Sequence, residues 1–194
     1  MSILLVAALG NPGGGYATTR HNLGWVVLDA FTERHGLVWR TQSEFQATLA
    51  RWDRSSGSSC YFVKPLTFMN DSGLAVSSVA RYFKIPSSDV AVLYDDVNIE
   101  LGLVKVSTAG SARGHNGVSS VLKYLGDDFV RYRLGIGPKV PVAMDLKDFV
   151  LGKFSPDQHL IVTQQLTYYL AGLELLLTSG ASAAMNHLNR RESK

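Results

Sequence analysis

The sequence predicts an α/β fold, a single domain in which helices flank a twisted, mixed and mainly parallel sheet. Short apolar runs typical of strands alternate with helical patterns along the chain. A serine- and glycine-rich stretch between two of these runs indicates a hairpin, which adds an antiparallel part. The length of 194 residues suits one domain with a substantial core, and no linker or repeat divides residues 1–194.

The elements follow from local patterns. Strand character marks residues 3–9, 45–52, 60–63, 90–94, 103–107 and 132–136, with the hairpin turn expected at 55–59. Apolar residues at spacings of three and four predict helices over 23–35, 72–83 and 116–125. Gly36 is a stop signal for the first of these helices. Pro156 suits the first turn of a long helix that ends near residue 178, and a last short helix is expected over 181–188.

The composition narrows the class of protein. Hydrophobic residues make up 46% and charged residues 18%, as in ordinary folded domains. The lone Cys60 cannot form an internal disulfide, and we interpret it as a small buried hydrophobe. A signal peptide and a run of about 20 apolar residues are both missing, so we predict a cytoplasmic protein without a membrane partner. The net charge of +3 and pI of about 9.0 suit an anionic partner such as RNA without requiring one.

Several familiar active-site motifs are missing. The glycine-rich loop 10–15 has neither the Gly-Lys-Ser/Thr ending of a P-loop nor a G-x-G-x-x-G pattern. The chain lacks G-x-S-x-G and H-E-x-x-H, and its five histidines show no metal-ligand spacing. We therefore expect no cofactor, no metal and no serine nucleophile.

A histidine and an aspartate are the leading candidates for acid–base chemistry. His21 precedes the helix expected at 23–35, where the helix dipole disfavours the imidazolium and so favours the neutral form that a general base needs. Asp95 follows the strand expected at 90–94, and a carboxylate there could orient the ring, as in a Ser-His-Asp arrangement with water replacing the serine. A helix-capping histidine and a turn aspartate are the alternatives.

Other polar residues follow the predicted strands, and the ligand site of such a sheet lies beyond the carboxyl ends of its strands. Asn11, Asn70 and Asn116 could donate to an oxyanion or bind a peptide backbone, although asparagine is also a common turn residue. Five basic residues could bind phosphate, or could equally be solvated surface charges. They are Lys64, Lys105, Arg113, Arg131 and Arg133.

Five segments, taken in order, resemble the bacterial-type peptidyl-tRNA hydrolase family. They are LGNPGGGYATTRHNLGW (9–25), KPLTFMNDSG (64–73), LYDDVNIELG (93–102), GSARGHNGVSSV (110–121) and RYRLGIGP (131–138). The resemblance covers most of the chain, and the first, second and fourth segments together are highly specific. It implies a monomeric, metal-free enzyme of translation that hydrolyses the ester between a peptide and the 3′ ribose of tRNA, recycling tRNA from peptidyl-tRNAs released prematurely from the ribosome.

The resemblance also implies residue roles. His21 matches the family's catalytic histidine, Asp95 the aspartate that supports its basic form, and Asn11 the asparagine that helps to distinguish peptidyl from aminoacyl groups. Positions lining the cleft for the tRNA 3′ end and the peptide are matched by Tyr16, Phe68, Met69, Asn70 and Asn116. Residues implicated in holding the acceptor end of tRNA are matched by His115, Lys105 and Arg133.

The chain departs from the family pattern at several positions. Phe68 stands where tyrosine is common, Asn98 replaces a common aspartate, and Arg113 replaces a glycine of the GSAGGHNG pattern. Ser107 and Ala109 occupy positions that are often basic, so Arg113 could supply the tRNA-binding charge from a neighbouring position.

Some questions stay open at this level. The oxyanion could be received by an asparagine amide or by a backbone N–H of the glycine loop. Residues 146–154, which precede the long helix, suggest a lid over the cleft. A non-catalytic RNA-binding relative and a small-molecule esterase are the rival functions. The pair of His21 and Asp95 argues against the first, and the basic residues argue against the second.

Overall fold

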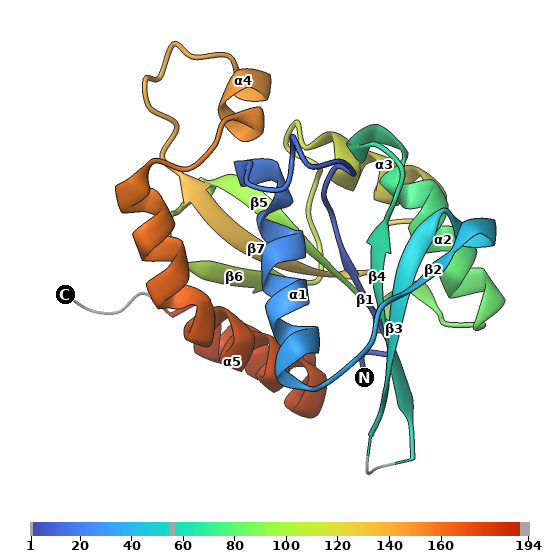
Figure 1. Cartoon of the computed structure of the whole chain (residues 1–194). Coiled ribbons are helices and arrows are strands. Elements are labelled where there is room, and N and C mark those ends of the chain that lie inside the picture. Colours follow the sequence, from blue (N-terminus) through green and yellow to red (C-terminus); the bar gives the residue numbers. More distant parts are fainter. Residues whose placement is uncertain (1, 55–56, 191–194) are drawn as a thin grey trace.

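In the computed structural model, seven strands form one mixed sheet in the order β2-β3-β4-β1-β5-β7-β6 (Figure 1). The structure describes residues 2–54 and 57–190. The four central strands run parallel: β4 (Ser59–Pro65), β1 (Leu5–Ala8), β5 (Val90–Glu100) and β7 (Val130–Gly137). Antiparallel strands flank them: β2 (Arg40–Gln42), β3 (Ala47–Asp53) and β6 (Val104–Ser107). The predicted mixed sheet with a parallel centre is confirmed.

Helices cover both faces of the sheet. Along β1, Val6 and Ala8 pack in one core with α1 (Leu23–Arg34) and α5 (Pro156–Leu188). Leu5 and Ala7 point the other way, into a second core with α2 (Ser72–Tyr82) and α3 (Asn116–Leu125). Successive side chains of a strand alternate between its faces, and a central parallel strand is covered on both, which explains its uniformly apolar sequence.

The predicted helices are confirmed, and several strands differ from the predicted ones in their bounds. The long α5 has a non-helical Gly180 (φ 82°, ψ 175°), which separates the two helices expected there. The short strand β2 was not predicted, because Arg-Thr-Gln at a sheet edge has no apolar pattern. The strand expected to begin at residue 45 starts at Ala47, after a 3-10 turn η2 (Ser43–Phe45). Strands β3 and β4 pair as a hairpin, but residues 55–56 of its predicted turn lie outside the described residues.

The strand carrying the candidate aspartate continues further than its apolar run. We expected a strand over 90–94, but β5 extends through Asp95 and Asp96 to Glu100. It pairs with β7 as far as Asp96 opposite Gly135, and the register then shifts. Asp95 and Asp96 are therefore strand residues whose backbone is still paired with β7. This pairing fixes the position of their side chains.

Helix α5 is long and apolar enough to cross a membrane by length and composition, and it is the one helix in the described part of the chain that meets this test. Core helices pass the same test. On α5, Tyr169, Leu173 and Leu176 are fully buried in the core that it shares with α1. Packing in the core accounts for these apolar residues.

A close approach at the start of α1 places the candidate histidine. A Cβ atom on Gly24 would lie 2.9 Å from the Leu93 carbonyl oxygen and 3.0 Å from that of Leu9. Because glycine has no Cβ, the helix can begin directly against the carboxyl ends of β1 and β5. The preceding 3-10 turn η1 (Arg20–Asn22) is thereby brought beside Asp95.

Candidate active site

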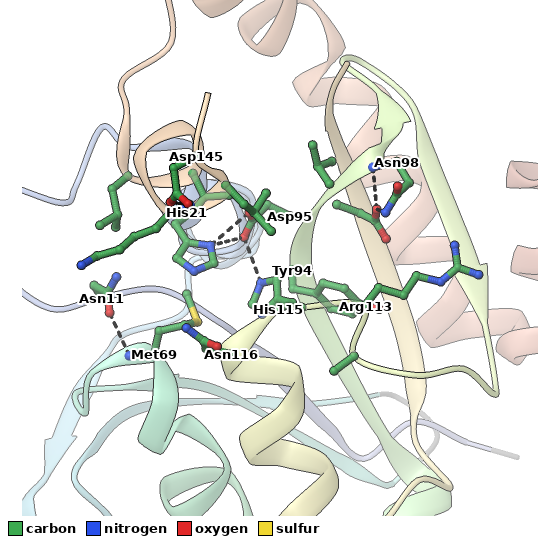
Figure 2. A pocket seen from close by; sticks show the side chains of 18 residues that line it. Asn11, His21, Met69, Tyr94, Asp95, Asn98, Arg113, His115, Asn116 and Asp145 are labelled. Atoms are coloured by element: carbon green, nitrogen blue, oxygen red, sulfur yellow. Dashed lines mark hydrogen bonds and ion pairs between the residues drawn. The ribbon is translucent and has the colours of Figure 1, made fainter. Parts of the chain in front are cut away.

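His21 and Asp95 form a buried pair at the carboxyl end of the parallel strands (Figure 2). The Nδ1 atom of His21 lies 2.9 Å from Oδ1 and 3.0 Å from Oδ2 of Asp95. The two residues are 7% and 3% exposed. The sequence prediction that these two residues meet is confirmed in geometry.

Asp95 is shared between two imidazoles. The Nε2 atom of His115 lies 3.2 Å from Asp95 Oδ1, and the His21 and His115 ring centroids are 4.7 Å apart. Burial by itself would raise the pKa of the Asp95 carboxyl. The electrostatic attraction and the hydrogen bonds from His21 and His115 outweigh this effect and hold the pKa of Asp95 well below its usual range. Asp95 is therefore an ionised acceptor.

The hydrogen-bond network assigns the protons on both rings. Since ionised Asp95 can only accept, the nitrogen that each histidine turns toward it carries a hydrogen. The other nitrogen of His115, Nδ1, accepts from the backbone N–H of Val118 at 3.2 Å and caps α3, which makes His115 a neutral Nε2–H tautomer. In neutral His21 the proton on Nδ1 leaves Nε2 with a free lone pair. Figure 2 shows this end of the ring on the cleft side, where Asn11 and Asn116 lie.

These three side chains also have the composition of a metal site. The ligand atoms of His21, Asp95 and His115 lie within 4.8 Å of one another. A metal there would need lone pairs on His21 Nδ1 and His115 Nε2, where the network places hydrogens. His115 would then have to carry its proton on Nδ1, which faces the Val118 N–H donor. The observed hydrogen bonds suit protons rather than a resident cation.

Asn11 is held by backbone and side-chain contacts. Its N–H donates to Asn22 Oδ1 at 2.9 Å, and its carbonyl accepts from Asn22 Nδ2 at 2.9 Å. Its own side-chain Oδ1 accepts from the Met69 N–H at 2.8 Å. That bond fixes the amide orientation, so Nδ2 is the end left for the cleft (Figure 2). Asn11 thus presents a preoriented donor near His21.

A cavity of about 380 Å³ opens in front of this group. Of the predicted site residues, the structure brings six to its wall: Asn11, His21, Met69, Asp95, His115 and Asn116. The other predicted residues are not among the lining residues: Tyr16, Phe68, Asn70, Lys105 and Arg133. Phe68 is 59% exposed next to Met69, and the exposed Asn70 donates to Asp71 Oδ2. These two side chains lie outside the cleft wall, where only a larger substrate would meet them.

The basic residues considered for phosphate binding differ in whether their side chains already have partners. Arg133 makes a two-atom contact with Asp96 Oδ2, through Nε at 2.9 Å and a terminal nitrogen at 2.8 Å. Lys105 lies opposite Arg133 in the antiparallel pairing of β6 with β7, and its side chain is exposed. Arg131 is 1% exposed and donates to backbone carbonyls, and Lys64 pairs with Asp29 between two tryptophans. The phosphate-binding prediction is therefore wrong for Arg131, whereas Lys105 is available to a partner.

Two departures from the family pattern acquire a structural meaning. Asn98 donates through its N–H and Nδ2 to Asp96 Oδ1 at 2.8 and 3.1 Å, and an aspartate side chain could not make the second bond. Arg113 lines the cleft, and its backbone has a left-handed φ of 47°. Glycine, which Arg113 replaces, adopts this backbone conformation without steric cost. Figure 2 shows the Arg113 side chain directed away from His21.

One wall of the cleft escaped prediction at the residue level. The short helix α4 (Leu146–Leu151) and its N-cap Asp145 line the cavity opposite Met69 and His115. The sequence indicated a lid in this region, but six residues are too few for helical periodicity to show. The available signal was Asp145, whose side chain accepts from the Lys147 N–H as an N-cap.

The fold and the site together define an α/β enzyme of the hydrolase class, with a buried histidine–carboxylate pair opening on a cleft. A family model described as peptidyl-tRNA hydrolase matches residues 5–194. The chain belongs to the peptidyl-tRNA hydrolase family.

Relatives match along nearly the full length. The chain is 42% identical over 188 residues to a peptidyl-tRNA hydrolase of Symbiobacterium thermophilum, covering 95% of this chain and 98% of the relative. It is 40% identical over 192 residues to that of Thermotoga petrophila, covering 97% and 98%. The crystal structure of the Acinetobacter baumannii peptidyl-tRNA hydrolase matches with a TM-score of 0.89 and 28% identity, covering 96% of this chain and 94% of that one.

Proposed function

We propose that this enzyme hydrolyses the ester between the peptide and the 3′ end of tRNA in peptidyl-tRNA, with His21 as the general base. The observation that carries the residue assignment is the buried contact of His21 Nδ1 with ionised Asp95, which leaves Nε2 as a proton acceptor at the cleft. Family membership and the relatives' names support the reaction.

In the reaction, His21 Nε2 takes a proton from a water molecule, and the water oxygen attacks the ester carbonyl. The ring becomes positively charged as the tetrahedral intermediate forms, and Asp95, 2.9 Å away, stabilises that charge. The proton then passes from His21 to the departing 3′ oxygen of the ribose. The products are tRNA with a free 3′ hydroxyl and a peptide carboxylic acid, which releases its proton to water and leaves as the carboxylate.

Asn11 is the best placed of the three candidate amides to receive the oxyanion. Its Nδ2 is oriented by the Met69 N–H contact and is buried with the side chain, whereas Asn70 and Asn116 are exposed. A donor that is already oriented stabilises developing charge without reorganisation, and removing one typically costs about 3–4 kcal/mol of barrier.

Substrate selection rests on two parts of the site. On the peptide side, Asn116 and the α4 wall contact the peptide, and a free aminoacyl group would bring a cationic amine where amide partners are needed. On the tRNA side, Lys105 and Arg133, with Arg113 nearby, hold the acceptor end. Tyr16, Phe68 and Asn70 contact the parts of the substrate that extend beyond the cavity.

We also propose the oligomeric state, the location and the composition of the active enzyme. Residues 1–194 act as one domain and as a monomer in the cytoplasm, without metal, cofactor or membrane. The single sheet with a helical layer on each face supports one folding unit. The proton positions around Asp95 support metal-free chemistry.

The decisive experiment measures release of N-acetyl amino acid from N-acetyl-aminoacyl-tRNA, with free aminoacyl-tRNA alongside and His21→Ala as the variant. We expect fast release from the blocked substrate alone, and a loss of turnover in His21→Ala with tRNA binding nearly intact. Near-normal turnover in the variant would refute the base assignment. No release by the wild type would refute the reaction and favour an RNA-binding role, to be tested by tRNA affinity against salt.

A further inference from the structure

The residue before the histidine has an unusual set of partners. The Arg20 guanidinium donates through one terminal nitrogen to the Phe149 carbonyl at 3.1 Å and through the other to Gln158 Oε1 at 2.8 Å. It also stacks on the rings of Phe149 and Phe154, at 4.5 and 5.4 Å from their centroids. One side chain thus joins η1 to the end of α4 and to the start of α5.

The acceptors lie at the ends of two helices. Phe149 lies in the last turn of α4, and its carbonyl accepts from the Gly152 N–H at 3.2 Å as well as from Arg20, at the end of the helix where the dipole favours a cation. Gln158 completes the capping box of α5, since its side chain accepts from the Ser155 N–H at 3.1 Å while it also binds Arg20. No described carboxylate contacts Arg20, so the guanidinium acts here as a forked donor rather than as half of an ion pair.

The backbone reinforces the same junction. The Arg20 N–H donates to the Gly152 carbonyl at 3.0 Å, and Thr19 forms an antiparallel bridge with Lys153. A Cβ atom on Gly152 would lie 2.8 Å from an Arg20 terminal nitrogen, so the glycine makes room for the guanidinium. Figure 1 shows α4 next to the first turn of α1 and the start of α5.

Helix α4 depends on this junction more than the other helices do. Phe149 is its one buried residue and is 2% exposed, while Lys147 and Asp148 are exposed. Elements with few buried contacts open most easily, so each remaining contact has a large effect on their position. The same helix supplies Leu146, Val150 and Leu151 to the cleft wall.

We propose that Arg20 is a positioning residue that fixes the α4 wall of the cleft at a set distance from His21. This inference rests on the proposed function, because the wall is taken to contact the peptide. Arg20 does not touch the reacting atoms. It shares the η1 turn with His21, so the wall and the base are held by adjacent residues of one turn.

The test compares Arg20→Lys with Arg54→Lys as the matched control. Arg54 also donates its guanidinium to backbone carbonyls, of Leu177 at 3.0 Å and of Ile3, but it is not among the residues lining the cleft. Lysine keeps the charge in both variants and loses the fork. The measurements are kcat and KM for N-acetyl-aminoacyl-tRNA, the pH profile of kcat/KM, and amide hydrogen exchange across residues 145–153.

For Arg20→Lys we expect kcat/KM to fall by roughly tenfold, mainly through a rise in KM because the displaced wall holds the peptide less well, since misplacement by about 1 Å can cost up to 10²-fold in rate. The pH profile should keep its shape, because the His21–Asp95 contact is intact. Exchange across 145–153 should accelerate in this variant and not in Arg54→Lys. Unchanged KM and exchange, or equal changes in both variants, would overturn the proposal. If the wild type releases nothing, the proposed function fails, and the exchange data still decide whether Arg20 holds α4.

Discussion

The carboxylate of Asp95 accepts from His21 at 2.9 Å and from His115 at 3.2 Å, so one buried charge orients two imidazoles. The family resemblance assigns His115 to tRNA binding, yet its two ring nitrogens are taken up by Asp95 and by the Val118 N–H. At the residue scale, His115 is therefore tied to the carboxylate, and a polar contact with tRNA would have to replace one of these bonds.

Asp95→Asn tests the role of this charge. The amide has nearly the same shape but carries no charge and can present its NH2 group to the ring, which favours the wrong tautomer of His21. We expect kcat to fall by roughly 10²–10⁴-fold with little change in KM, since substrate contacts remain. Steady-state kinetics on N-acetyl-aminoacyl-tRNA measures this.

The matched control for Asp95→Asn is Asp53→Asn. Asp53 is exposed and paired with Arg51 in the β3–β4 hairpin. Its replacement should leave kcat unchanged. A fall in kcat of less than about fivefold in Asp95→Asn would be too small for a lost tautomer and would remove Asp95 from the mechanism.

At the scale of elements, α1 and α2 end in the same way with different residues. After α1, the Leu37 N–H donates to the Thr32 carbonyl, with Gly36 at φ 64°. After α2, the Ile85 N–H donates to the Ala80 carbonyl, with Lys84 at φ 55°. Both are Schellman ends, in which the left-handed position favours glycine. The glycine was visible as a stop signal, whereas the lysine was not.

Exchanging these two residues gives opposite predicted effects. Lys84→Gly should raise the free energy of unfolding by about 0.5–1 kcal/mol, because the left-handed strain exceeds the entropy that glycine gains in the unfolded chain. Gly36→Lys should lower it by a similar amount, since a Cβ there meets nothing within 4 Å and only the backbone conformation is strained. Urea unfolding of both variants checks this, and a change of the same sign in both would contradict it.

At the scale of the whole molecule, several basic side chains that contribute to the net charge of +3 are paired or buried. Arg133 is bound to Asp96, Lys64 to Asp29, and Arg131 is buried. The charge that counts for tRNA is therefore smaller than the number of lysines and arginines suggests. The exposed Lys105, near Arg133 in the sheet, and the cleft residue Arg113 are the two candidates among the exposed basic side chains that we assign to tRNA.

Salt dependence tests this distribution of charge. If Lys105 contacts a phosphate, Lys105→Ala should raise KM and reduce the slope of log KM against log salt by about 1. Arg51→Ala, in the hairpin, is the control and should leave the slope unchanged. An unaltered slope in Lys105→Ala would place the tRNA surface elsewhere on the molecule.

Local sequence determined the fold class and most elements of this protein. The periodicity of 116–125 predicted α3 to the residue, because it depends on neighbours within one or two turns. The strand ends also pointed to Asn11 and Asp95 as site residues. The polar β2 and the short α4 were missed, because neither has enough residues for a period to appear.

Only the tertiary structure decided which partners the functional residues have. The sequence spacing is 74 residues between His21 and Asp95, and 129 and 138 between Arg20 and its two acceptors. Proton positions on His21 and His115, the burial of Arg131 and the attachment of α4 to Arg20 all follow from such distant contacts. A local pattern shows which face of an element is apolar, but packing of the whole chain determines what each polar group meets.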